Sequence, residues 1–419
     1  MHSGYNDEQS IRAALPALEN QTGKDEYSMS TKFFTNCRIM DVVQEKVFDG
    51  SVLVDGSTIQ EVGANLTCPP EAQVIDLGGK VLMPGMFNCH THMCLAPEAD
   101  PHYDNDDCQV TMMALQHLKK FIDSGTTFIR DVGGIDYIDV DLRNGARSGG
   151  FAAPDMQVAG KCICMTGGHG WSMGRQADGV DDCRRAAREQ LRAGADWIKV
   201  MATGGVMTKG VEPGSPQLNE DELRAAIEEG HKVGAKACTH AQGMTGIKNA
   251  LRAGVDSIEH GFFMDDWCFD WMKAHNVFYV PTLAAMYWIY VSGTEAGIQD
   301  YVMRKVNNTF AAHRDTFLRA YKAGVKIALG TDAGTPFNGH EKTAYEMVLM
   351  TEAGMTNWDA LKTGTVNAAE LCGVSDTLGT VEAGKRANFT VFAGDPSQEI
   401  HAVMDCRMTV VGGEILYQA

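Results

Sequence analysis

The sequence predicts an α/β protein: a (β/α)8 barrel that carries a small β-sandwich domain built from both ends of the chain. Two observations support this prediction. Residues 84–373 alternate charged helical stretches with short apolar runs, whereas residues 31–83 and 374–419 contain only short β-type runs such as KFFTNCRIM and ANFTVFAG. Alternating helices and strands favour a parallel sheet, and short strands alone favour a separate β-module.

The first thirty residues are polar and weakly patterned, so we expect an N-terminal extension over residues 1–30. The strand-rich ends that flank the middle are each too small to bury a core alone. We therefore expect residues 31–83 and 374–419 to form one composite β-sandwich domain.

In the middle segment, glycine separates a helical stretch from an apolar run five times, in DSGTTFIR, RAGADWIKV, KVGAKACTH, RAGVDSIEH and KAGVKIALG. Glycine is favoured just past a helix end, where the backbone turns left-handed. Asn219 and Glu222 have the spacing of a capping box at a helix start. About 290 residues of such units suit an eight-fold barrel over residues 84–373. A doubly wound open sheet is the alternative, but no GxGxxG turn opens a helix.

The composition disfavours several classes of partner. With 36 basic and 54 acidic residues, the formal charge of −18 disfavours nucleic acid and anionic membrane surfaces. No signal-peptide pattern and no apolar stretch of about 18 residues is present. The 12 cysteines are spread singly, which is typical of reduced thiols, so we expect a cytoplasmic protein.

Polar residues stand at the ends of several apolar runs. In a parallel barrel the carboxyl ends of the strands meet on one face, where the active site lies. We therefore interpret these residues as candidate metal ligands: His90, His92, Lys199, His240, His260 and Asp332.

The individual signals are of unequal strength. His90 and His92 would share one face of a strand, although a His-X-His pair alone is more often two unrelated surface or packing histidines than a metal site. Lys199 lies within the apolar run WIKVM, where its ammonium group either reaches solvent or meets a partner. Burial favours the neutral amine, which can react with carbon dioxide to give a metal-bridging carbamate. His240 and His260 end consecutive runs one repeat apart, and Asp332 is either a turn residue or a metal-bound general base.

Taken together, these residues and the sequence around them resemble the amidohydrolase superfamily, in its imidazolonepropionase-like and Xaa-Pro dipeptidase or carboxypeptidase-like branch. The resemblance covers nearly the whole chain from about Lys32. It rests on MPGMFNCHTH, TTFIRDVGG, TGGHG, WIKVMATGG, HAQGMTGIKNALRAGVDSIEHG, GTDAG and GTVEAGKRANFTVF.

The resemblance implies two divalent metal ions, with zinc expected. His90 and His92 would bind one ion with Asp332, His240 and His260 the other, and a carboxylated Lys199 would bridge both. A metal-bridging hydroxide would attack the carbonyl of a dipeptide, an N-acyl amino acid or a similar small amide. Asp332 would take the proton and pass it to the leaving amine. A homo-oligomer is usual in this branch.

The resemblance also suggests substrate contacts. His169, in TGGHG, would contact the substrate or the developing oxyanion. Gln242 occupies a position where related proline dipeptidases have a tyrosine, which puts prolidase-type specificity in doubt. Tyr287 and Lys209 lie in loops that could face the substrate, with Trp171 and the segment after Thr335 shaping the entrance. Arg130 and Asp131 are expected to form a structural ion pair beneath the site.

Three other functions stay open at this stage. A cyclic-amide or imidazolone hydrolase, or a deaminase, would use one metal ion and no bridging lysine. A lactone or ester hydrolase could use the same hydroxide. A non-catalytic barrel would not need the six candidate ligands.

Overall fold

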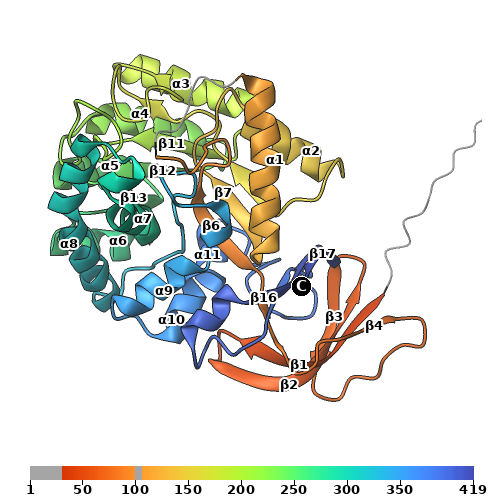
Figure 1. Ribbon diagram of the computed structural model, residues 1–419. Helices are drawn as coiled ribbons and strands as arrows, with labels where there is room; N and C mark the ends of the chain where they lie inside the picture. Colours follow the sequence, from red (N-terminus) through yellow and green to blue (C-terminus); the bar gives the residue numbers. More distant parts are fainter. Residues whose placement is uncertain (1–30, 100–105) are drawn as a thin grey trace, which may run out of the picture.

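The computed structural model describes residues 31–99 and 106–419. The N-terminal extension predicted over residues 1–30 lies outside the described residues. Within the described ranges, the chain has an α/β body of parallel strands surrounded by helices, and a second, strand-rich part that projects from one side (Figure 1).

The strand-rich part joins both ends of the chain in one eight-stranded sheet with the order β17-β16-β15-β5-β1-β2-β3, while β4 pairs with β1. The N-terminal strands are β1 (Lys32–Asp41), β2 (Lys46–Asp55), β3 (Thr58–Gly63), β4 (Gln73–Asp76) and β5 (Val81–Pro84). The C-terminal strands are β15 (Phe389–Phe392), β16 (Cys406–Val411) and β17 (Glu414–Gln418). The antiparallel pairing of β5 with β15 connects the two sets. Phe34 and Phe389 meet edge to face at 5.7 Å in the shared core, so neither set buries its apolar face alone.

The strands of the α/β body fall into two parallel sheets. One contains β6 (Met86–Thr91), β7 (Thr126–Asp131) and β8 (Asp155–Val158). The other has the order β10-β9-β11-β12-β13-β14, with β9 (Ile163–Cys164), β10 (Arg175–Gln176), β11 (Trp197–Met201), β12 (Lys236–Ala241), β13 (Ser257–His260) and β14 (Phe278–Val280).

Backbone hydrogen bonds connect the two sheets on both sides. The segment 326–333 lies between β14 and β6, because Ala328 N donates to Tyr279 O and Cys89 N donates to Leu329 O at 2.7 Å. On the other side, Asp196 N, just before β11, donates to Val158 O at 2.8 Å. These strands therefore present their carboxyl ends on one face, as the sequence predicted.

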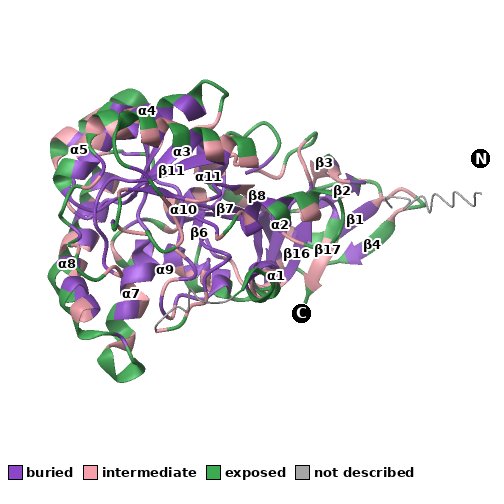
Figure 2. Ribbon diagram, turned by 90° about the horizontal axis from the view of Figure 1, so that it is seen from above, coloured by how far each residue is buried: buried purple, intermediate pink, exposed green. Residues whose placement is uncertain are grey.

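Helices cover the outside of these sheets, with their buried faces turned toward the strands (Figure 2). They are α1 (Asp107–Asp123), α2 (Ile138–Arg147), α3 (Val180–Ala193), α4 (Glu220–His231), α5 (Met244–Ala253), α6 (Asp266–His275), α7 (Leu283–Ser292), α8 (Asp300–Lys322), α9 (Tyr345–Glu352), α10 (Asn357–Thr363) and α11 (Val366–Leu371). Short 3-10 turns occur at Thr294–Ala296, His340–Lys342 and Ile400–Met404. None of the helices in the described ranges combines the length and the apolar character that crossing a bilayer requires.

The predicted glycine helix ends and the predicted capping box are confirmed. Gly194 and Gly254 end α3 and α5 in the left-handed conformation, with φ of 102° and 95°. Asn219 caps α4, and its side chain and that of Glu222 form the reciprocal bonds of a capping box. The two glycines end their helices just before β11 and β13 begin, and the capping box marks the start of α4.

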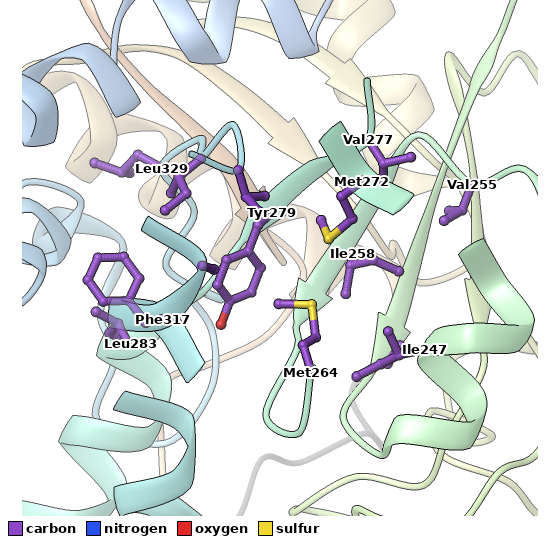
Figure 3. Close-up of a cluster of buried hydrophobic side chains, with 14 of the residues drawn as sticks. Ile247, Val255, Ile258, Met264, Met272, Val277, Tyr279, Leu283, Phe317 and Leu329 are labelled. Carbon is purple, nitrogen blue, oxygen red and sulfur yellow. The ribbon is translucent and has the colours of Figure 1, made fainter. Parts of the chain in front are cut away.

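The largest core cluster packs strands β13 and β14 against the helices around them, as Figure 3 shows for Ile258, Tyr279, Met272 and Phe317. Tyr279 is completely buried, and its hydroxyl donates to His260 O at 2.8 Å. This bond connects the hydrophobic core directly to the end of β13, where a candidate ligand lies.

Candidate functional site

At the carboxyl end of β6, His90 and His92 approach Asp332. The distances from their Nε2 atoms to Asp332 Oδ1 are 3.4 and 3.2 Å, and the three ligand atoms lie within 4.8 Å of one another. Asp332 follows the segment that pairs with β6, and its backbone N–H donates to His90 O at 2.8 Å. The predicted i, i+2 histidine pair and the distant aspartate therefore meet at one point.

The other ring nitrogen of each histidine is already engaged. His90 Nδ1–H donates to Glu259 Oε2 at 2.7 Å, and His92 Nδ1–H donates to Gly133 O at 3.0 Å. Such partners fix the tautomer of a metal-binding histidine and its ring orientation. Both Nε2 atoms thereby face Asp332.

His240 and His260, at the ends of β12 and β13, are held in the same way. His240 Nε2–H donates to Gly204 O at 3.1 Å, and His260 Nδ1–H donates to Thr282 Oγ1 at 2.7 Å. Burial lowers the pKa of both imidazoles well below the ordinary value, so both rings are neutral and can offer a lone pair to a cation. Their ring centroids lie 4.5 Å apart, and that of His260 lies 5.0 Å from that of His90.

Lys199 lies in the middle of β11 and is 1% exposed. Its side chain reaches the same cavity as the four histidines and Asp332. Within the described part of the chain, no ion pair involves its ammonium nitrogen. The structure thus brings all six predicted ligand residues to one cavity.

Two of these residues have an unusual backbone. His260 and Asp332 have φ of 71° and 60°, in the left-handed region that residues other than glycine rarely adopt. Each such residue costs about 1–3 kcal/mol and persists where the surroundings enforce it, commonly at functional sites. Burial would raise the pKa of Asp332, but His90 and His92 outweigh it and hold this pKa well below its usual range.

His169 lies beside His240, with 4.2 Å between ring centroids, in the loop after β9. Its Nδ1 shares a hydrogen bond of 2.8 Å with Thr208 Oγ1. Burial lowers the pKa of His169 to about 4, so the ring is neutral at physiological pH. His169 lines the same cavity as the six candidate ligands.

The cavity above these groups has a volume of about 390 Å³. Its floor is polar, and one wall is apolar: Val206, Met207, Phe262, Ala285, Met286 and Ile289. Gln242 lines it as well, 4% exposed, and the side-chain oxygen has no hydrogen-bond partner. Lys209, Trp171 and Thr335 also border it.

Tyr287 does not line this cavity. Its ring packs against Trp288 and Tyr345, and its hydroxyl accepts from Tyr345 at 3.2 Å. Helix α7 turns Ala285, Met286 and Ile289 toward the cavity, which places Tyr287 on another face. The structure therefore does not support the predicted substrate contact of this residue.

The predicted ion pair of Arg130 with Asp131 is wrong. Neighbouring residues on a strand point to opposite faces, and Arg130 pairs with Glu259 at 2.9 Å instead. Asp131 accepts from the backbone of Met93 and Gly133. Sequence reasoning missed Glu259, although a carboxylate inside the run DSIEH carries the same signal as Lys199 in WIKVM. Thr282 carried no comparable signal.

Comparison with known proteins decides the family. The model of the amidohydrolase family matches residues 81–416. The chain belongs to the amidohydrolase family.

Similar proteins agree with this membership. The chain is 30% identical over 357 residues to ochratoxinase from Aspergillus niger, covering 76% of this chain and 72% of that protein. It is 23% identical to imidazolonepropionase from Geobacillus thermodenitrificans, covering 90% and 93%. A solved Xaa-Pro dipeptidase with methionine in its active site superposes with a TM-score of 0.86 at 30% identity, covering 93% and 100%. As an amidohydrolase, the chain is a hydrolase that acts on carbon–nitrogen bonds.

Proposed function

We propose that this amidohydrolase cleaves the amide bond of a small substrate that carries an apolar group, in a metal-dependent reaction with water. The observation that carries the proposal is that four imidazoles, each held by a hydrogen bond to a protein oxygen, meet Lys199 and Asp332 at one cavity. Uncompensated polar groups are costly in such a place, so a cation that pairs with them explains their burial.

The donor set fits divalent metal ions. Each of the four histidines has one ring nitrogen bonded to a protein oxygen, which leaves the other for a cation. We propose that His90 and His92 would hold one ion with Asp332, that His240 and His260 would hold a second, and that a carboxylated Lys199 would serve as a ligand shared by both. Imidazole and carboxylate ligands suit zinc. Bound divalent ions supply a more acidic water and positive charge for a carbonyl oxygen.

The residues of the chain perform the proton transfers and orient the substrate. Asp332 accepts the proton of the attacking water and delivers it to the leaving amine. His169 stays neutral, and a Thr208 hydroxyl that donates to its Nδ1 leaves Nε2–H to donate to the carbonyl oxygen of the substrate.

The cavity lining indicates the substrate class. Phe262, Met286 and Ile289 offer an apolar wall to an acyl group or an apolar side chain. Gln242 offers an uncharged hydrogen-bonding group, and Lys209 is an exposed residue of the lining. N-acyl amino acids and dipeptides with a large apolar residue fit these surroundings.

Two finer aspects of the fold are also proposals. The connected parallel strands would form a closed eight-fold barrel over residues 84–373. The terminal sheet would curl into a sandwich over residues 31–83 and 374–419.

The test combines metal counting with a substrate panel. Protein reconstituted with zinc, with and without bicarbonate, is assayed against N-acyl amino acids and dipeptides, with Asp332→Asn as the inactive reference. We expect about two ions per chain and bicarbonate-dependent activity. One ion per chain with no carbamate on Lys199 would replace the proposal by a single-metal cyclic-amide hydrolase or deaminase.

A further inference from the structure

Helix α8 places a buried cation against the cavity-lining loop that follows β11. Lys305 is 2% exposed, and its Nζ donates to Thr208 O at 2.6 Å and to Gly205 O at 3.1 Å. No carboxylate pairs with it among the residues that the structure describes. A buried ammonium without a paired carboxylate is costly, so its two carbonyl acceptors compensate for it, together with the Tyr301 ring, whose centroid lies 5.4 Å from Nζ.

The loop that Lys305 holds also orients two histidines of the site. Gly204 O accepts from His240 Nε2–H, and Thr208 Oγ1 bonds His169 Nδ1. The His169 ring lies directly against Gly205, where an added Cβ would come within 2.4 Å of it. Both carbonyls that bind Lys305 therefore belong to residues in contact with the His169 ring. Gly205 packs against this ring, and the hydroxyl of Thr208 is hydrogen-bonded to it.

Helix α8 makes further contacts with this loop, including a hydrogen bond of 2.9 Å from Tyr301 Oη to Met207 O. Val302 and Val306 pack against Val206 in an apolar cluster, which fixes distance but not orientation. Arg304 pairs with Glu212 at 2.6 Å, but both side chains are 53% exposed, so this pair contributes little. Lys305 is thus the buried charged anchor of α8 on residues 204–208, beside the half-buried Tyr301.

We propose that Lys305 is a positioning residue: by binding the carbonyls of Gly205 and Thr208, it fixes the orientation of His169 and His240. The effect on turnover rests on the proposed hydrolase function. The effect on the two rings does not, because the hydrogen bonds of the loop set it directly.

The experiment compares Lys305→Met with Lys305→Arg and with Arg304→Ala, which removes only the exposed pair on the same helix. The ring nitrogens of ¹⁵N-histidine-labelled full-length protein are followed by NMR, alongside kcat and KM. In Lys305→Met we expect the His169 and His240 signals to move and kcat to fall about 10–100-fold, with a smaller change in KM. Lys305→Arg recovers most of both effects because a guanidinium can also donate to two carbonyls. Arg304→Ala changes neither.

Unchanged histidine signals in Lys305→Met would overturn the proposal, as would moved signals with normal kcat. If Lys305→Met does not fold, Lys305→Gln takes its place, because glutamine keeps a donor but on a side chain one bond shorter. Unchanged histidine signals, or moved signals with normal kcat, would overturn the proposal in this variant as well. If no substrate is found for the wild type, the proposed function fails while the ring signals still test the positioning.

Discussion

The Nδ1–H of His90 donates to Oε2 of Glu259 at 2.7 Å, and neither side chain is accessible to solvent. The other oxygen of Glu259 accepts from Arg130 at 2.9 Å and from Ser257 Oγ at 2.5 Å. This carboxylate therefore joins the end of β6 to β7 and β13 at the point where the proposed metal site lies.

Replacing Glu259 by Gln should weaken metal binding and stability together. The variant leaves Arg130 as a buried charge without its carboxylate and gives His90 Nδ1–H a weaker or competing partner. We expect a loss of about 3–5 kcal/mol in the free energy of unfolding and about 10–100-fold in metal affinity. Urea unfolding and metal titration measure these effects. Ser257→Ala removes the hydroxyl that donates to Glu259 and accepts from Arg130 but keeps the ion pair between them, so it is the control and should cost less.

Gly205→Ala should impair activity without preventing folding. The new Cβ would come within 2.4 Å of the His169 ring, so the ring must shift from its present place beside His240. We expect kcat to fall about 10-fold or more, because an oriented donor at the carbonyl oxygen contributes on that scale. Gly214→Ala in the same loop is a matched control, since an added Cβ there meets nothing within 4 Å. Equal kcat in the two variants would remove His169 from the reaction.

Part of the candidate site could be predicted from the sequence, and part depends on tertiary packing. The meeting of His90, His92 and Asp332 could be predicted because each follows an apolar run where a strand ends, and parallel strands bring such ends together. Lys199, in the middle of β11, could be singled out because an ammonium group inside an apolar run needs a partner. Partners across the fold, such as Thr282 for His260, have no local pattern and depend on tertiary packing. Tyr287 was misplaced because its face on α7 depends on where that helix begins, which the apolar run LAAMYWIYV does not specify. Lys305 lies in a charged helix and looks solvent-exposed in the sequence.

Glu346 should make stability depend on pH in a predictable direction. It is fully buried, caps the start of α7 by accepting from the N–H groups of Leu283 and Ala284, and burial raises its pKa to about 8. The folded protein therefore keeps a proton that the unfolded chain releases above a pKa of about 4.3. The contribution of protonated Glu346 to the free energy of unfolding is therefore present at low pH, and it is lost as pH rises through a folded-state pKa of about 8. The free energy of unfolding of Glu346→Gln should fall less than that of the wild type between pH 5 and 8.5. A parallel decline in both proteins would contradict this.

Gln242→Leu should have opposite effects on stability and on substrate binding. In the folded protein the side-chain oxygen of Gln242 is buried without a partner, and an apolar side chain of similar size avoids that desolvation cost. We therefore expect the free energy of unfolding to be unchanged or to rise by about 1 kcal/mol. The substrate, in contrast, loses a hydrogen-bonding group inside a largely apolar cavity, so KM should rise about 10-fold while kcat changes less. Thermal unfolding and steady-state kinetics measure the two effects on the same preparation. A residue that serves only packing would move stability and leave KM unaltered, so a stabilised variant with raised KM assigns Gln242 to substrate recognition.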